Sequence, residues 1–351
     1  MSRYEKITLE KFNDLVQDHE ASLTDVKTNL KETRYEAGGV ITATQDTPLG
    51  KLIMKGKLND NGFNGMCERI GAPGRWLKSH KCPPDLEQTI VHRLNEDQVK
   101  NSLIRYRQAG GNDDQLIRAV LSDQYLPYNH LDMWQDIKNA IVGTKLEGLD
   151  PKIWKPYISE AMDAWILFEG VVADPEGYNP KLYDGGGAGG LKPAIHIRNS
   201  EDGQGKVRID SGFYRSYCTN GVIFGLNERA SLSAIHRGKS KHFMRANVAM
   251  AVAGAARACG LGINKFIKAT TIEIKTNVID KVVDEWTSSY HIAVGTKENW
   301  TKSLTSVRTW ADLVMATSDF AGTLQDRNES TQFEELSGEL LFAPINQEYR
   351  L

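Results

Sequence analysis

The sequence predicts an α+β protein whose core is an antiparallel β-sheet in strand–strand–strand–helix order, with an N-terminal helical layer and a helical C-terminal part. Three observations indicate this class. Residues 194–209 alternate between apolar and polar side chains around a glycine-containing turn, as a β-hairpin does. The alanine-rich segment 245–260 predicts a helix beyond that hairpin. Apolar residues at helical spacing before and after this core predict further helices.

Composition and turn signals divide the chain into five predicted parts. We expect an N-terminal arm, a helical layer with one strand, the sheet with its alanine-rich helix, a set of C-terminal helices and an acidic tail. Their boundaries are 1–60, 61–150, 151–275, 276–325 and 326–351. The arm is expected to be irregular or extended, because turn formers flank its short apolar stretch. The tail has isolated apolar residues among acidic ones and is expected to be solvated.

The helical layer is predicted from residue 63 to about residue 110. Leu86, Ile90 and Leu94 lie near helical spacing after two prolines that mark a helix start. A strand is then expected over 116–121, and a helix follows in which Met133 and Ile137 share one face.

The sheet is predicted from one apolar strand and the two strands of the hairpin. The segment DAWILFEGVVAD is rich in strand formers, and Ile195, Ile197, Val207 and Ile209 alternate with polar residues on either side of Glu-Asp-Gly-Gln-Gly. This alternation predicts a sheet with one apolar and one basic face. The alanine-rich helix that follows is expected to end at Gly260.

Composition excludes several classes of protein. The 351 residues are 40% hydrophobic and 25% charged, as in folded domains, and no run approaches the length that spans a bilayer. The first twenty residues carry charge throughout, unlike a secretory signal. The four cysteines are far apart, so we expect free thiols in a reducing cytoplasm. The histidines show no metal-ligand spacing, so neither a metal site nor a cofactor is expected.

Charge is distributed unevenly along the chain. The net charge is −2, but residues 192–275 hold fourteen Lys/Arg and five Asp/Glu, which gives +9. The remaining 29 basic and 40 acidic residues give −11. A positive segment within an acidic chain is what steering of a polyanion requires. The alternative is that these charges decorate several unrelated faces.

The positive segment supplies candidate nucleic-acid-binding residues. Its densest stretch is NERASLSAIHRGKSKHFMRAN, whose glycine and serines would let backbone amides approach a phosphate. A solvated charged loop explains the same stretch equally well. The predicted phosphate contacts also include arginines of the neighbouring strands, and tyrosines there offer rings for stacking on unpaired bases. The full set is Arg198, Arg208, Arg215, Tyr214, Tyr217, His236, Arg237, Lys239, Lys241 and Arg245.

A cysteine nucleophile is the enzymatic alternative. Cys218 would need a neighbouring base or cation to lower its pKa, and His236 is one candidate. Ser200 and Asn220 would complete such a site. Strand alternation also explains Cys218 as a small apolar filler, and Asn220-Gly221 as a turn. The sequence assigns no catalytic residue.

Four blocks resemble a known family in their order along the chain. CERIGAPGRWLKSHKCPPDLEQTIVHRLN, IRAVLSDQYLPYNHLDMW, HIRNSEDGQGKVRIDSGFYRSYCTNGVIFG and AIHRGKSKH are similar to successive blocks of the phage- and plasmid-borne proteins grouped as domain-of-unknown-function family 932. The resemblance spans about residues 60 to 245. It implies a setting on mobile elements in a bacterial host cell, and a role in DNA metabolism or in conflict with the host.

The predicted order of elements gives a looser resemblance. Three strands, a helix that crosses the sheet and a basic strip are similar to the core of ring-forming single-strand annealing recombinases of the RecT and Redβ type. This is an analogy of fold order. It implies binding of single-stranded DNA and annealing by a homo-oligomer, without nucleotide hydrolysis.

The leading hypothesis from the sequence is therefore single-stranded DNA binding and annealing in phage or plasmid recombination. Two rivals stay open: an enzyme that acts on nucleic acid through Cys218 and His236, and an interaction protein with an anti-defence or virion role. In the last case a protein partner would bind the acidic C-terminal tail. No membrane partner is expected.

Overall fold

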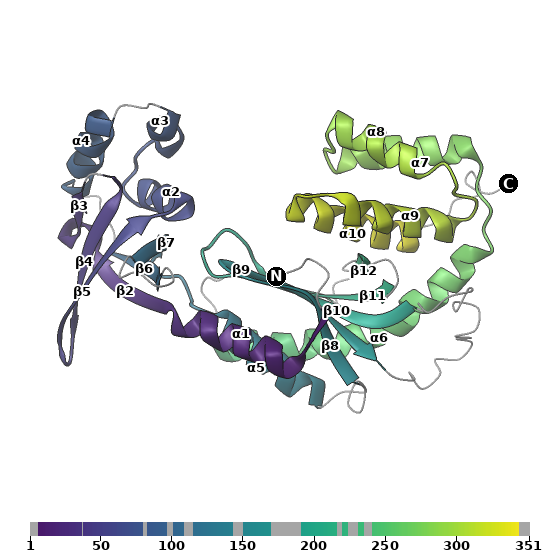
Figure 1. Ribbon diagram of the computed structural model, residues 1–351, viewed down its shortest axis with the longest axis horizontal. Helices are drawn as coiled ribbons and strands as arrows, with labels where there is room; N and C mark the ends of the chain where they lie inside the picture. Colours follow the sequence, from purple (N-terminus) through teal and green to yellow (C-terminus); the bar gives the residue numbers. More distant parts are fainter. Residues whose placement is uncertain are drawn as a thin grey trace.

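The structure is a computed structural model of the chain. It describes residues 6–36, 38–79, 83–96, 101–108, 115–142, 150–169, 191–215, 220–223, 231–234 and 241–343. The fold is α+β, with two sheets rich in antiparallel pairs and helices in the C-terminal part (Figure 1). No helix within these ranges is both long and apolar enough to cross a bilayer.

The larger sheet, called the central sheet here, contains the predicted hairpin. Its strands pair in the order β1-β8-β9-β10-β11-β12, with β13 also paired to β11, and every pairing is antiparallel. The bounds are β1 Lys6–Thr8, β8 Asp150–Ile158, β9 Ala161–Glu169, β10 Leu191–Ser200, β11 Val207–Arg215, β12 Asn220–Ile223 and β13 Ser231–Ala234.

One face of the central sheet is apolar, as predicted. Ile195, Ile197, Val207 and Ile209 are fully buried there. Three helices cover this face: α1 (Leu9–Ala21), α5 (His130–Val142) and α6 (Lys241–Thr270). Helix α5 confirms the helix predicted around Met133. Burial of each such side chain contributes roughly 1.5–3 kcal/mol, so this core holds the sheet and the three helices together.

The alanine-rich helix is longer than predicted. Helix α6 has 30 residues and continues through Gly260, which was expected to end it. Gly260 is therefore not a C-cap. Phe266 and Ala269, in the last turns of the helix, are buried against the C-terminal helices, and this packing stabilises the continuation.

The second sheet, called the N-terminal sheet here, corrects the prediction of an irregular arm. Its strands pair in the order β2-β6-β7-β5-β4-β3, and β5–β7 is the one parallel pair among its described pairings. The bounds are β2 Leu23–Asn29, β3 Arg34–Glu36, β4 Val40–Thr47, β5 Gly50–Leu58, β6 Asn101–Gln108 and β7 Gln115–Ser122, with a 3₁₀ turn at Leu30–Glu32. Most of residues 6–60 are thus regular structure.

The helical layer is confirmed only in part. Helices α2 (Asp60–Arg69), α3 (Gly74–Ser79) and α4 (Pro83–Leu94) lie where helices were predicted, and the predicted strand at 116–121 is β7. Residues 101–108 were expected to be helical and form strand β6 instead. In that strand Ile104 and Tyr106 are buried against the helix-covered face of the sheet.

Four helices form the C-terminal part. They are α7 (Thr276–Ser289), α8 (Val294–Ser303), α9 (Trp310–Thr323) and α10 (Arg327–Phe342), and α9 and α10 lie beside β12 (Figure 1). The predicted solvated tail is wrong for residues 327–342, which are helix α10. Phe333, Leu336 and Leu340 are fully buried in this part of the core. Asp326 begins the helix by accepting a hydrogen bond from the Glu329 amide.

Candidate functional site

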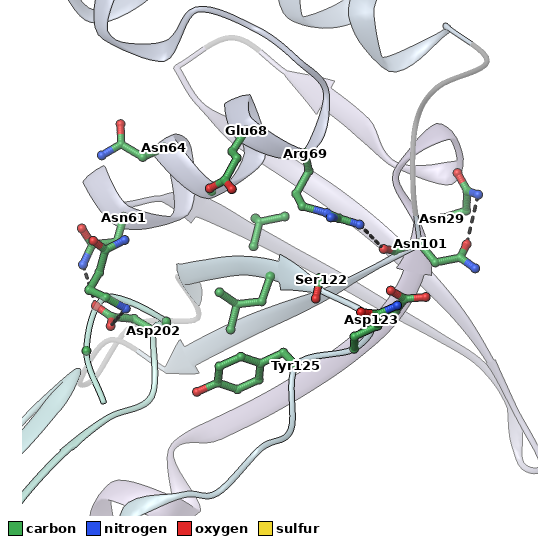
Figure 2. A pocket seen from close by; sticks show the side chains of 17 residues that line it. Asn29, Asn61, Asn64, Glu68, Arg69, Asn101, Ser122, Asp123, Tyr125 and Asp202 are labelled. Carbon is green, nitrogen blue, oxygen red and sulfur yellow. Dashed lines mark hydrogen bonds between the residues drawn. The ribbon is translucent and has the colours of Figure 1, made fainter. Parts of the chain in front are cut away.

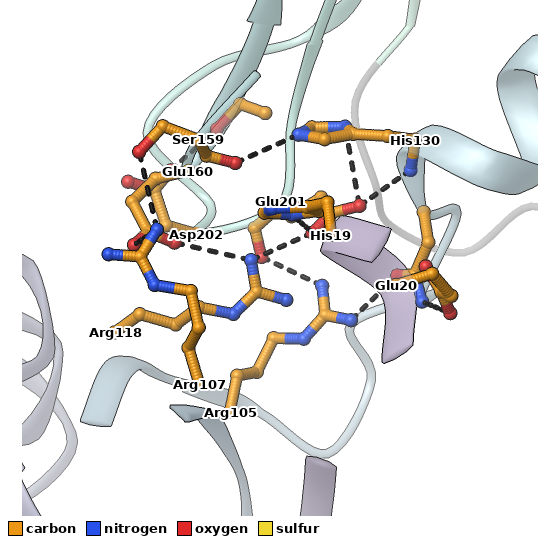
Figure 3. A network of polar contacts seen from close by, with 12 residues as sticks. His19, Glu20, Arg105, Arg107, Arg118, His130, Ser159, Glu160, Glu201 and Asp202 are labelled. Carbon is orange, nitrogen blue, oxygen red and sulfur yellow. Dashed lines mark hydrogen bonds and ion pairs between the residues drawn. The ribbon is translucent and has the colours of Figure 1, made fainter. Parts of the chain in front are cut away.

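A buried network of charges joins the two sheets (Figure 3). Arg105, Arg107 and Arg118 come from β6 and β7 and point away from the helix-covered face of the N-terminal sheet. The register between these strands shifts at Arg105/Tyr106, so that Arg118 is the extra residue of a β-bulge. A bulge re-aims side chains locally, and here it lets Arg118 point the same way as Arg105.

Glu201, at the turn between β10 and β11, is the central acceptor of this network. Its Oε2 accepts from Arg118 Nη1 at 2.7 Å, and it lies 3.2 Å from His19 Nε2. Its Oε1 accepts from the His130 backbone amide at 2.5 Å. Burial alone would raise the pKa of Glu201, but three groups outweigh it: the His130 ring, which is protonated at the low pH where Glu201 titrates, and the His19 and Arg118 side chains. The pKa is therefore well below the usual range. Glu201 is therefore an ionised carboxylate in a dry interior.

The remaining arginines extend the network. Arg105 is fully buried and makes a bidentate pair with Asp25 at 2.8 and 3.0 Å, and its Nη1 donates to the Glu201 carbonyl at 2.8 Å. Arg107 pairs with Glu160 at 2.8 Å. The bidentate pair of Arg105 and Asp25 is the arrangement that the planar guanidinium group favours. Every one of these bonds except Arg105–Asp25 links the N-terminal sheet to the central one.

His130 is a neutral, fixed imidazole. Its Nε2 lies 3.1 Å from the carbonyl of Ser159, so Nε2 carries the proton. Its Nδ1 then accepts from Asn199 Nδ2 at 3.1 Å, and the Asn199 amide is oriented by donating to the Tyr128 carbonyl. Burial lowers the pKa of His130 to about 4. The ring is thus uncharged at neutral pH.

Three of these residues could together meet a metal ion. The ligand atoms of His19, His130 and Glu201 lie within 4.8 Å of one another. Two histidines and a carboxylate are a donor set that zinc accepts. However, Glu201 already accepts from Arg118, and His130 Nδ1 already accepts from Asn199. A divalent ion would have to displace both bonds beside a buried guanidinium, so the arrangement fits an ion-paired interface better than a metal centre.

A polar groove of about 870 Å³ opens beside this network (Figure 2). One wall is helix α2, which presents Asn61, Asn64 and Glu68 along one stripe. Glycines on the same helix bring it against β7: a Cβ on Gly62 or Gly65 would lie 2.5 or 2.4 Å from a β7 carbonyl oxygen. The opposite wall is the 122–125 turn and the tip of the β10–β11 hairpin.

Two predicted phosphate contacts lie on the polar face of the central sheet. Arg198 and Arg208 are cross-strand neighbours there. Arg198 lies 3.3 Å from Asp163 and donates to Asn328 of α10, while Arg208 pairs with Asp210 at 3.0 Å and with Glu335 of α10. His196 and Asp163 lie on the same face, 3.0 Å apart. The expected basic face is therefore a face of mixed charge, partly covered by α10.

Two further predicted contacts lie on the other side of that sheet. Lys241 and Arg245, in the first turns of α6, pair with Asp132 and Asp136 of α5 at 2.8 Å each. Both helices pack on the apolar face. The structure thus divides the four described cations between opposite sides of the sheet, and each has a carboxylate partner. It does not bring them into one continuous surface.

Most of the other predicted site residues lie outside the described part of the chain or have side chains that are not described. Tyr217, His236, Arg237 and Lys239 lie outside the described residues, as does Cys218 of the enzymatic alternative. The backbones of Tyr214, Arg215 and Asn220 belong to β11 and β12, and their side chains are not described. Ser200 is buried and donates to Asp202 at 2.6 Å. The predicted roles of these residues stay predictions.

An exposed basic surface occurs on the N-terminal sheet, where none was predicted. We call it the lysine face. Its cations are Lys27, Arg34, Lys51, Lys55 and Lys57, which are all exposed. The registers place them opposite the buried side of the sheet, where Val26, Tyr35 and Ile41 point into the core. Glu36 pairs with Lys55 at 2.7 Å, and Asp46 is exposed beside Lys51. Five cations against these two carboxylates give +3.

Comparison with known proteins identifies no relative: no family model, no curated protein and no solved structure matches this chain. The resemblance to domain-of-unknown-function family 932 stays a prediction from the four sequence blocks.

Proposed function

We propose that this protein binds single-stranded DNA and promotes annealing of complementary strands, as the sequence predicts, and that the lysine face is the surface that contacts phosphates. The observation that carries the proposal is the exposed charge of +3 on one side of β2–β5. Lys27, Lys51 and Lys57 make no ion pair with any described residue. Unpaired lysines release condensed counterions when they meet a phosphate, whereas paired ones must first give up a carboxylate.

The surroundings of these lysines also support contact with an extended strand. Thr42, Thr44 and Ile53 lie between them on the same side, and Ile53 is 63% exposed. Hydroxyl and apolar side chains next to cations suit sugar and base contacts. The predicted cations Arg198 and Arg208, by contrast, already pair with carboxylates of the chain. The lysine face therefore offers the more available charge.

Annealing without nucleotide hydrolysis needs only that two strands be held and aligned. We propose that copies of this chain act together in this, because one lysine face covers only a short stretch of backbone. Fluorescence anisotropy of a labelled oligonucleotide tests binding, and a strand-pairing assay without nucleotide tests annealing. Binding at low salt that weakens steeply with added salt is expected. If the protein does not bind the oligonucleotide at low salt, the proposal is wrong.

A further inference from the structure

The groove of Figure 2 shares Asp202 with the buried network of Figure 3 and includes no residue of the lysine face. Asn61 and Asp202 lie at one end, and Asn29 and Asn101 at the other. Its floor includes Val120 and Leu121 of β7. A volume of about 870 Å³ is within the range of ligand sites, which are about 300–1,000 Å³.

The walls of this groove hold more negative than positive charge. Asp202 is 6% exposed, and its described partners are all neutral: the Asn61 amide at 2.6 Å, the Ser200 hydroxyl at 2.6 Å and the Gln204 backbone amide at 3.0 Å. No cation among the described residues pairs with this carboxylate, and electrostatic interactions are stronger in a region of low dielectric than in water. Its field therefore reaches the groove.

Two exposed carboxylates strengthen this field. Glu68 on α2 and Asp123 on the opposite wall have no partner among the described residues. The single cation of the lining, Arg69, donates to Ser102 Oγ at 3.2 Å and to the Asn101 carbonyl at 2.7 Å, and it pairs with no described carboxylate. Three carboxylates and one guanidinium give the lining a charge of −2.

Uncharged polar groups supply the rest of the lining. Asn64, Gln124 and Gln204 also line the groove, and their side chains make no hydrogen bond to a described residue. Carboxamides offer both donors and acceptors, which match the N–H and C=O groups of a peptide backbone. The negative charge excludes phosphates and favours amines and guanidinium groups.

We propose that this groove binds a short peptide segment that carries lysine or arginine. Carboxamide side chains of the walls form hydrogen bonds with the peptide backbone, and Glu68, Asp123 and Asp202 bind the cationic side chains of the peptide. This inference does not depend on DNA binding, because the groove and the lysine face are separate surfaces of opposite charge.

The test uses the full chain and a fluorescein-labelled peptide of alternating lysine and serine, with an alternating glutamine–serine peptide as the neutral probe. Saturable binding of the lysine peptide at low salt is expected, with little binding of the neutral one. The double variant Glu68→Gln, Asp123→Asn should weaken binding about tenfold. The matched control Asp280→Asn, Glu298→Gln removes two exposed carboxylates of α7 and α8 and should leave the affinity unchanged.

Both variants change exposed side chains, so their melting temperatures should equal that of the wild type. Failure of the wild type to bind the lysine peptide overturns the proposal, and so does equal loss of affinity in the groove and control variants, which would indicate a general charge effect. Neither result bears on the oligonucleotide titration, so the two proposals fail separately.

Discussion

Arg118 donates from Nη1 to Glu201 Oε2 across 2.7 Å, and neither side chain is exposed to solvent. Arg118 belongs to the N-terminal sheet and Glu201 to the central sheet, 83 residues further along the chain. Among the described residues the buried apolar clusters of the two sheets are separate, and this ion pair in the interior bridges them. Removal of one partner leaves the other charged and buried, which makes the junction sensitive to single substitutions.

Replacement of Arg118 by methionine should destabilise the protein by about 3–5 kcal/mol, because it leaves the Glu201 carboxylate buried without its guanidinium partner. Urea unfolding measures this loss. Lys297→Ala, which breaks the exposed pair with Asp284, serves as the control and should cost less than about 1 kcal/mol. A loss below that level for Arg118→Met would mean that the junction is held by other contacts.

Stability should fall as the pH drops from about 6.5 to about 4. The pKa of His130 is about 4 in the folded chain and near 6.5 when unfolded, so in this window the unfolded chain binds a proton that the folded chain does not. Glu201 acts in the same direction below its usual pKa, because its folded pKa is lowered. The His130 part amounts to about 3 kcal/mol across the window. Urea midpoints at pH 7 and pH 4.5 measure it.

His130→Asn should flatten this dependence between pH 6.5 and pH 4.5, whatever its effect at pH 7. The exposed His242 serves as the comparison, since its replacement should leave the slope as it is. An unchanged slope in His130→Asn would assign the acid sensitivity to other groups.

Gly65→Ala should destabilise the protein, although alanine is normally the better helix former by about 1 kcal/mol. A Cβ at Gly65 would lie 2.4 Å from the Val120 carbonyl oxygen, so α2 would have to move off β7. Gly295→Ala is the matched control: it is also helical, has open space around it and should be neutral or stabilising. Thermal melts of both variants decide the matter, and a Gly65→Ala melt at or above wild type contradicts the close packing.

Phe333→Ala should cost about 3–5 kcal/mol. The ring is fully buried and makes edge contacts with Trp300 and Phe320 at centroid distances of 5.3 and 4.9 Å. A solvated tail would tolerate the change with a loss below about 0.5 kcal/mol. Urea unfolding of the full chain therefore distinguishes a docked α10 from a free one.

Local patterns were sufficient for part of the fold. Ile195, Ile197, Val207 and Ile209 have the period of two that a half-buried hairpin requires, and Met133 and Ile137 have helical spacing. The acidic composition of residues 326–351 favours a solvated tail, but Phe333, Leu336 and Leu340 share one helical face and are buried. Spacing alone could have identified α10 as a docked helix.

Strand β6 shows a different kind of failure. Ile104 and Tyr106 alternate with Arg105 and Arg107, which is strand periodicity, whereas the prediction of a helix to about residue 110 extends the pattern of the preceding segment. The burial of Arg105 and the partial burial of Arg107 do not follow from the strand itself, because Glu160 and Glu201 approach from more than 50 residues away. Arginine within an apolar strand is the sequence signal for such a junction.

The sequence also contains a pattern that predicts part of the lysine face. Lys51, Lys55 and Lys57 are an even number of residues apart, so a strand places them on one side. The prediction of an irregular or extended arm over residues 1–60 assigns no common side to these lysines. The groove could not be predicted, since α2, the 122–125 turn and the 202–205 turn meet only in the folded chain.

The salt dependence of oligonucleotide binding tests the central claim most directly. For a single strand, log Kd changes with log salt concentration by about 0.7 for each phosphate neutralised, so Lys51→Gln, Lys55→Gln, Lys57→Gln should lower that slope by about 2. The control triple Lys268→Gln, Lys275→Gln, Lys302→Gln, exposed elsewhere, should leave it unchanged. The proposal would be contradicted if the first triple variant left the slope unchanged and the triple variant Arg237→Gln, Lys239→Gln, Lys241→Gln lowered it. That result would mean that DNA binds the residues predicted from the sequence and not the lysine face.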